Sequence, residues 1–188
     1  QDGANCFKGA LPHIEIDQMK YSLDTLAFRN SFAALPNDFY SRVTPTPFST
    51  AAQLIHFNTL AAQLLDLDPA VQHDARCADA FSGKHALPGT APLAMLYSGH
   101  QFGHYVPQLG DGRAILLGEI INTRHEAWEI QLKGSGQTPY SRQGDGRAVL
   151  RSSIREYLCS EAMHGLGIPT TRALCVIGSD DEVYREQI

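Results

Sequence analysis

Two copies of one short sequence, Gly-Asp-Gly-Arg-Ala, constrain the fold of this chain more than any other feature. They lie at 110–114 and at 144–148. Glycine permits positive φ angles and lets backbone N–H groups approach an anion closely, because no Cβ intrudes. The first copy runs into a strand pattern and the second into a helix pattern. We therefore interpret the two copies as separate anion-contacting turns rather than as parts of a duplicated domain.

Positive charge gathers around these two turns. Arg113, Lys133, Arg142 and Arg147 all fall in or between them, while the whole chain has a net charge of −5. A helix that starts directly after the second turn adds partial positive charge and free N–H donors. Binding to nucleic acid or to anionic membranes usually needs a basic excess, so the acidic balance argues against both. The local charge instead predicts a small anionic ligand, and a polyphosphate in particular.

Length and composition indicate one domain, or one domain with a long arm, since 188 residues with 43% apolar content can build a core. The four cysteines are widely spaced and none forms a CxxC pair. This spacing favours free thiols and a cytoplasmic location over a zinc knuckle or a disulfide framework. The sequence has no run of about 18 apolar residues, so we expect no transmembrane helix. No signal peptide is visible. Because the chain starts at Gln1 rather than Met, we expect its natural N-terminus to be missing or replaced.

We divide the chain into an extended N-terminal arm (1–48), a helical extension (49–99) and a ligand-binding region (100–188). In the arm we expect a loop at the start, a short helix at 21–30 and a proline-punctuated extended segment at 31–47. In the extension, Ser49 or Thr50 is expected to cap a helix that ends before Pro69. A second short helix is expected at 71–81.

The sequence pattern of the ligand-binding region predicts an α+β fold, with a small twisted antiparallel sheet and one packed helix. A hairpin around the first glycine turn should pair 105–108 with 113–120. The segment 127–133 alternates as a strand, with Trp128, Ile130 and Leu132 on one face and Lys133 on the other. The best helix pattern covers 148–166, and further strands are expected at 171–177 and 182–187.

His100 and His104 are four residues apart, which would suit a metal pair on a helix. Gly99 and Gly103 make a helix doubtful there, and two ligands without a third are weak evidence for a metal. We favour histidines that hydrogen-bond to loop backbone, and we assign no metal site within the chain.

The order of the expected elements is that of a protein-kinase small lobe, in which a strand lysine neutralises phosphates and a helix glutamate orients it. Lys133 and Glu156 fit these two roles. Glu156 is the one charged residue in a helix stripe of small or apolar side chains, so we expect it to have a cationic partner. Simple solvent exposure of Lys133, or a purely structural ion pair, is the plainer alternative.

Four longer segments carry a family resemblance: NSFAALPNDFYSRVTPTP, YSGHQFGHYVPQLGDGRA, LKGSGQTPYSRQGDGRAVLRSSIREYL and SEAMHGLGIPTTRAL. They resemble the selenoprotein O (YdiU-like) family over roughly residues 28–188. The resemblance implies a protein-kinase-like fold and a protein adenylyltransferase activity, which transfers AMP from ATP to Ser, Thr or Tyr hydroxyls of protein substrates with Mg²⁺ or Mn²⁺. It also implies that ATP binds inverted relative to ordinary kinases.

Carried over by motif, the resemblance implies phosphate binding by Lys133 and an ion pair between Lys133 and Glu156. The nucleotide contacts that it implies are Gly110, Gly112, Arg113, Asp145 and Gly146. Two plainer alternatives stay open at this point. Asp145 could cap the helix that follows it, and Arg113 could form a surface salt bridge.

The chain departs from the family in length, because the family's catalytic aspartate and metal-binding Asn and Asp lie after the small lobe. No HRD-like or DFG-like motif is present. We therefore expect an N-terminal fragment that holds half of a nucleotide site and is inactive alone, with its metal ligands elsewhere. The alternatives are a phosphoryl-transferring kinase, which the missing GxGxxG motif argues against, and a non-catalytic scaffold or dimerising module.

Overall fold

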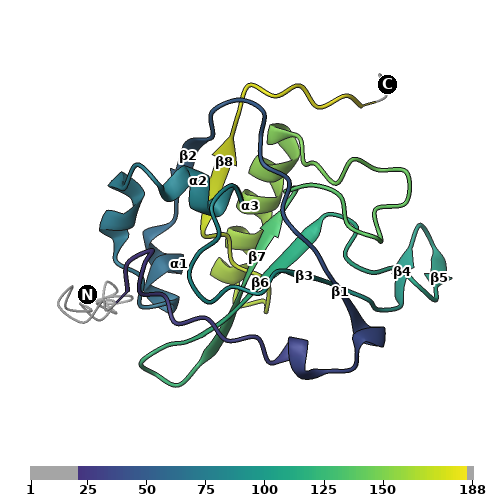
Figure 1. Ribbon diagram of the computed structural model, residues 1–188, viewed down its shortest axis with the longest axis horizontal. Helices are drawn as coiled ribbons and strands as arrows, with labels where there is room; N and C mark the ends of the chain where they lie inside the picture. The colour runs from purple at the N-terminus through teal and green to yellow at the C-terminus, as the bar shows by residue number, and fades with distance from the viewer. Residues whose placement is uncertain (1–20, 186–188) are drawn as a thin grey trace, which may run out of the picture.

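The computed structural model describes residues 21–185, which form an α+β fold around a small antiparallel sheet (Figure 1). The sheet has four strands in the order β1-β3-β6-β7. Their bounds are Tyr40–Arg42 for β1, Leu93–Met95 for β3, Ala114–Ile121 for β6 and Ala127–Lys133 for β7. The expected α+β class and antiparallel pairing are therefore confirmed. None of the helices in this part of the chain is long and apolar enough to cross a membrane.

The hairpin of β6 and β7 is the longest pairing in the sheet, and β7 has the bounds that its alternating pattern predicts. Asn122, which is 3% exposed, closes the turn by accepting bonds from the backbone N–H groups of Arg124 and Glu126. The pairing shifts register between Leu116 and Gly118. A Cβ on Gly118 would meet the carbonyl oxygen of Arg29 at 2.5 Å, so this glycine lets the N-terminal arm pack closely against the sheet.

Side chains of β6 reach the core on both faces of the sheet, as expected for a strand with an almost wholly apolar body. Ile115, Leu117 and Ile120 join the main cluster, together with residues of two short helices. These are α1 (Thr59–Leu64) and α2 (Cys77–Phe81). On the other face Leu116 packs with Leu93 of the adjacent strand β3 and with Tyr40 of β1. The arm thus contributes a strand to the sheet and is not merely laid over it.

The expectation of helices before residue 82 is only partly correct. The first half of the helix expected after Ser49 is instead strand β2 (Gln53–Phe57), which pairs antiparallel with β8 (Cys175–Gly178). Asn58 then accepts bonds from two backbone N–H groups and starts α1. The pattern at 53–57 fits a strand as well as a helix, and the distant partner strand decides the outcome.

Other expected helices differ as well. The short helix expected at 71–81 is a 3-10 turn, η4 (Pro69–His73), followed by α2. The segment 21–30 contains no helix, and 31–39 contains two more 3-10 turns, η2 (Phe32–Ala34) and η3 (Asn37–Phe39). The helical extension expected at 49–99 therefore contains strands β2 and β3 as well as helices. The loop expected at 1–20 lies outside the described residues.

The strands expected near the first glycine turn and at the C-terminal end also differ from the structure. Strand β5 (His104–Val106) pairs with β4 (Gly99–Gln101) and not with β6, because Phe102 and Gly103 take positive φ angles of 53° and 82° and turn the chain earlier. Strand β8 pairs with β2, and residues 182–185 form no strand. The remainder of the strand expected at 182–187 lies outside the described residues.

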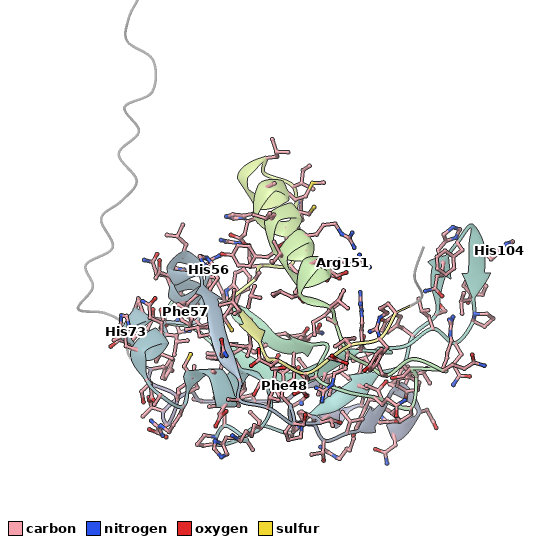
Figure 2. The ribbon with its side chains drawn as sticks, turned by 90° about the horizontal axis from the view of Figure 1, so that it is seen from above. Phe48, His56, Phe57, His73, His104 and Arg151 are labelled. Carbon is pink, nitrogen blue, oxygen red and sulfur yellow. The ribbon has the colours of Figure 1, made fainter. Side chains whose placement is uncertain are left out.

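Helix α3 (Leu150–Gly165) is present within two residues of the expected bounds, but it is not packed on the sheet by its apolar stripe. Leu150, Ile154 and Leu158 are 42–62% exposed. The helix is held by polar contacts instead, as the Tyr157 hydroxyl lies 2.9 Å from His56 Nε2 of β2. Glu161 pairs at 2.7 Å with Arg172, which holds the pKa of this carboxyl at about 2. Figure 2 shows α3, marked by Arg151, and the β4–β5 hairpin, marked by His104, rising from the same side of the molecule.

Candidate functional site

The first glycine turn (110–113) is fixed by a buried aspartate. Asp111 is 6% exposed, and its carboxylate accepts bonds from the Met95 N–H at 3.0 Å and from the Tyr97 hydroxyl at 2.9 Å. Burial and this bond to Asp111 raise the pKa of Tyr97 to about 12. Gly110 has a φ of +64°, and a Cβ there would lie 2.6 Å from the Tyr140 ring. The turn is therefore fixed against Met95 at the end of β3, and Gly110 is needed for its shape.

The loop that joins the two turns is fastened to the backbone of the first turn. The Thr138 hydroxyl donates to the carbonyl oxygen of Asp111, and the Ser141 hydroxyl donates to that of Gly112. The ring of Tyr140 lies against Gly110, and its hydroxyl is 3.0 Å from that of Ser41 in β1. These contacts hold residues 138–141 rigidly beside the first turn.

The second glycine turn (144–147) depends on contacts with distant segments. Gly146 has a φ of +69°, and a Cβ there would overlap the carbonyl group of Gly136. The guanidinium of Arg147 donates to the carbonyl oxygens of Thr46 at 2.8 Å and Pro47 at 2.7 Å, and it lies over the Phe48 ring. Arg147, which adds to the local positive charge in sequence, is thus engaged by the N-terminal arm.

Asp145 is exposed and does not cap α3. Its carboxylate accepts bonds from the Arg147 N–H at 2.8 Å and from the guanidinium of Arg185 at 2.8 and 3.0 Å. The Arg185 guanidinium lowers the pKa of Asp145 below its ordinary value. The N-cap residue of α3 is Val149, which makes no side-chain capping bond. The helix-capping alternative for Asp145 is therefore wrong, and its role toward a nucleotide stays a prediction.

Lys133, Glu156 and Arg113 form one cluster. Glu156 lies 3.1 Å from Lys133 Nζ through one carboxylate oxygen and 3.0 Å from Arg113 Nη2 through the other. Pairing of Ala114 with Lys133 in the β6–β7 ladder brings the two cations side by side. The expected Lys133–Glu156 ion pair is present, and the surface salt bridge considered for Arg113 is made to the same glutamate.

The three side chains of this cluster are 44–53% exposed. The expectation that Glu156 has a cationic partner is therefore confirmed, although the carboxylate is exposed. Exposed pairs contribute roughly 0–1 kcal/mol each to stability. The effect of the cluster is to position two cations around one carboxylate, rather than to hold the fold together.

Both glycine turns line one open cleft of about 710 Å³. Its remaining lining comes from Tyr97, Gln101, Leu109, the loop 140–143, Tyr184 and Arg185. Five of the expected nucleotide contacts are brought together here, namely Gly110, Gly112, Arg113, Asp145 and Gly146. Lys133 and Glu156 do not line the cleft and are linked to it through Arg113. The N–H groups of Gly110, Asp111 and Gly144 already donate to protein carbonyl oxygens. The N–H groups of Gly112 and Gly146 are therefore the better donors to an anion, and the arginines supply charge, as a polyphosphate site requires.

Several lining residues escape prediction from the sequence. Nothing in the sequence around Tyr97 and Tyr140 indicates that they line the cleft, because their positions depend on contacts with Asp111 and Ser41. Arg185 lies in a segment expected to be a strand. Arg142 did carry a signal, since it is a charged residue in the polar loop directly before the second turn.

His100 and His104 lie on the exposed β4–β5 hairpin and not on a helix. Within residues 21–185 neither imidazole makes a hydrogen bond, so the interpretation that they bind loop backbone is wrong. The same part of the chain contains no group of three His, Cys, Asp or Glu side chains that could hold a metal ion.

Comparison with known proteins gives consistent matches. A family model described as "Protein adenylyltransferase SelO" matches residues 22–187. The chain is 61% identical over 165 residues to a protein nucleotidyltransferase YdiU of Thiobacillus denitrificans, covering 88% of this chain and 34% of that relative. It is 55% identical over 167 residues to the protein of that name from Myxococcus xanthus, covering 89% and 34%. The chain spans about a third of the length of these relatives.

Proposed function

The chain belongs to the protein adenylyltransferase SelO family, and from this we propose that it supplies the nucleotide-binding part of a protein adenylyltransferase. The whole enzyme would transfer AMP from ATP to Ser, Thr or Tyr hydroxyls of protein substrates. One observation carries the proposal: both glycine turns line a single cleft, from which Arg113 reaches Glu156, the partner of Lys133.

The proposed site residues have distinct roles. Gly110, Gly112 and Gly146 would let backbone N–H groups approach the phosphates, and Asp145 would contact the nucleotide from the second turn. Arg113 and Lys133 would neutralise phosphate charge, and Glu156 would orient both cations. Neither Gly110 nor Gly146 leaves room for a side chain, since a Cβ would meet the Tyr140 ring at Gly110 and the backbone of Gly136 at Gly146.

In AMP transfer, the acceptor oxygen bonds to the α-phosphorus while the bond from that phosphorus to pyrophosphate breaks. Negative charge then develops on the departing pyrophosphate. Cations that are fixed before the reaction stabilise this charge without further rearrangement. We propose that ATP lies inverted relative to its orientation in ordinary kinases. The second turn supports this orientation, because it adds an anion-contacting element beside the first turn.

A protein-kinase-like small lobe is part of the proposal. The antiparallel order β3-β6-β7, the lysine at the end of β7 and the glutamate on α3 all support it. Divalent Mg²⁺ or Mn²⁺ would shield the phosphates in the complete enzyme. Residues 21–185 gather no ligand set for such an ion, so we assign none of its ligands here. A cytoplasmic location also remains a proposal, supported by the free thiols of Cys77, Cys159 and Cys175.

The test follows the position of a radioactive label. The complete gene product that carries this sequence is incubated with ATP, Mg²⁺ or Mn²⁺ and a protein mixture. Proteins should become labelled from α-³²P-ATP and not from γ-³²P-ATP. Lys133→Ala should reduce labelling by at least about a hundredfold, since a charge that stabilises the transition state is lost. Lys84→Ala is the matched control, because Lys84 is also exposed and ion-paired, here with Asp79, and does not line the cleft.

The alternatives give different outcomes. Transfer of the γ-label would show kinase chemistry and overturn the adenylyltransferase proposal. ATP binding without transfer of either label would show a non-catalytic nucleotide-binding module. Equal loss of activity in both lysine variants would show that the effect of Lys133 is not specific to the site.

A further inference from the structure

Arg142 stands apart from the other arginines of the cleft. Of the four arginines that line it, Arg113 pairs with Glu156, Arg185 pairs with Asp145, and Arg147 binds carbonyl oxygens of the arm. Arg142 lines the same cleft and is exposed. Within the described residues its guanidinium has no carboxylate in salt-bridge range and no hydrogen-bond partner. Its full charge therefore faces the cleft without a protein partner.

The backbone of Arg142 is in an uncommon conformation. Its φ is +55°, in the left-handed region that residues with a Cβ rarely adopt. Glycine or asparagine would adopt this conformation with less strain. Strained backbone of this kind persists where the surroundings enforce it, and it concentrates at ligand sites. The conformation therefore points to a use for the arginine side chain that glycine could not serve.

The surroundings do enforce it. The residue before Arg142 is Ser141, whose hydroxyl donates to the carbonyl oxygen of Gly112 in the first turn. Two residues after it, the Gly144 N–H donates to the Ser141 carbonyl oxygen at 2.8 Å and closes a tight turn. Arg142 thus sits between the two glycine turns, because hydrogen bonds of its neighbour Ser141 join the segment to both turns.

We propose that Arg142 is a phosphate-binding residue that contacts the β- or γ-phosphate of the nucleotide held between the two turns. This inference rests on the proposed function, and it adds a residue to that site. A polyphosphate is favoured over an acidic protein segment because Arg142 lies between two turns whose glycines favour close approach of backbone N–H groups to an anion. A guanidinium can bind phosphate oxygens with two parallel hydrogen bonds, so Arg142 could hold a phosphate that lies between the two turns.

The test compares nucleotides that differ only in their phosphates. Arg142→Asn removes the charge and tolerates a positive φ, so the variant should fold at least as stably as the wild type. Affinities for ATP, ADP and AMP are measured by calorimetry. We expect Arg142→Asn to weaken ATP binding by roughly tenfold, since a charge-assisted hydrogen bond is lost. AMP binding should change by less than about twofold, because AMP lacks the outer phosphates.

Two further variants make the outcome specific. Arg124→Asn removes the same charge from the β6–β7 turn, outside the cleft, and should leave ATP affinity unchanged. Arg142→Lys should retain part of the affinity, because the charge remains. Unchanged ATP affinity in Arg142→Asn, or an equal loss for AMP and ATP, would overturn the assignment while leaving the nucleotide site standing. A wild-type protein that binds no ATP would overturn both the Arg142 assignment and the proposed nucleotide site.

Discussion

The two copies of Gly-Asp-Gly-Arg-Ala in this chain are held in place by different means. In the first copy Asp111 is buried and binds the Met95 N–H and the Tyr97 hydroxyl, both from nearby sequence. In the second copy Asp145 is exposed and pairs with Arg185. Arg113 reaches across to α3, whereas Arg147 holds the N-terminal arm. One sequence thus makes a turn anchored by a buried aspartate in one place and a turn anchored by exposed contacts with the arm and Arg185 in the other.

The difference shows that the shared sequence does not by itself fix the backbone shape of the turn. The positive φ lies on the first glycine of the first copy, Gly110 at +64°, and on the second glycine of the second copy, Gly146 at +69°. The roles of the aspartate and the arginine come from their neighbours. The predictions below use matched substitutions in the two copies, so that each pair tests this contrast.

The largest contrast should come from the glycines. A Cβ at Gly146 would overlap backbone atoms of Gly136, while a Cβ at Gly110 would meet the Tyr140 side chain, which can shift. Gly146→Ala should therefore destabilise the protein by more than about 3 kcal/mol, and Gly110→Ala by about 1–3 kcal/mol. Urea unfolding measures both values. An equal or reversed order would show that the second turn adjusts more easily than its contacts indicate.

The aspartates should give the next largest contrast. Asp111→Asn places an amide group where a buried carboxylate accepts two hydrogen bonds, so we expect a loss of about 2 kcal/mol. Asp145→Asn should change stability by no more than about 0.5 kcal/mol, because its ion pair with Arg185 is exposed. Thermal unfolding of both variants, with the wild type as reference, checks the difference. Similar losses in the two variants would contradict the assignment of Asp111 as the buried anchor.

The arginines should separate stability from ligand binding. Arg147→Gln removes two guanidinium bonds to the arm and a ring contact, and it should cost about 1 kcal/mol of stability. Its effect on ATP affinity should be small, since the guanidinium is already engaged. Arg113→Gln should change stability by less than about 1 kcal/mol and weaken ATP binding by roughly tenfold. Calorimetry and unfolding on the same two preparations are needed. A large loss of ATP affinity in Arg147→Gln, with little change in Arg113→Gln, would instead identify Arg147 as the phosphate ligand.

The smallest contrast concerns acid pH. The pKa of Asp145 is lowered by Arg185, so its contribution to stability is present above its ordinary pKa of 3.8 and fades as the pH falls below that value. Between pH 5 and about 3, wild type should lose slightly more stability than Asp145→Asn. The exposure of the pair keeps this difference below about 0.5 kcal/mol. A larger acid loss in the variant would show that Asp145 is not ion-paired in solution.

The sequence predicts the parts of this molecule whose signals are local. Strand β7 follows from strict alternation, α3 from its helix pattern, and the Lys133–Glu156 pair from one lysine and one glutamate in the expected elements. Strand β2 could not be predicted, because its partner β8 lies more than a hundred residues away and its own pattern also fits a helix. The exposure of the apolar stripe on α3 was missed for a related reason. Polar contacts of Tyr157 and Glu161, made with distant residues, orient the helix.

The candidate site shows the same division. Gly110, Gly112, Arg113, Asp145 and Gly146 were expected near a ligand from sequence, and the structure brings them to one cleft. The partners of Arg147 in the arm could not be foreseen, because backbone carbonyl groups carry no sequence signal. For the same reason, the fastening of Ser141 to Gly112 becomes visible only in the structure.

The central claim is that the two turns bind one nucleotide together, and amide NMR tests it most directly. In ¹⁵N–¹H correlation spectra of the chain titrated with ATP, the N–H signals of Gly110, Gly112, Gly144 and Gly146 should all move. They should follow a single binding curve with one Kd, because one ligand contacts both turns. Shifts confined to one turn, or two curves with different Kd values, would contradict the account.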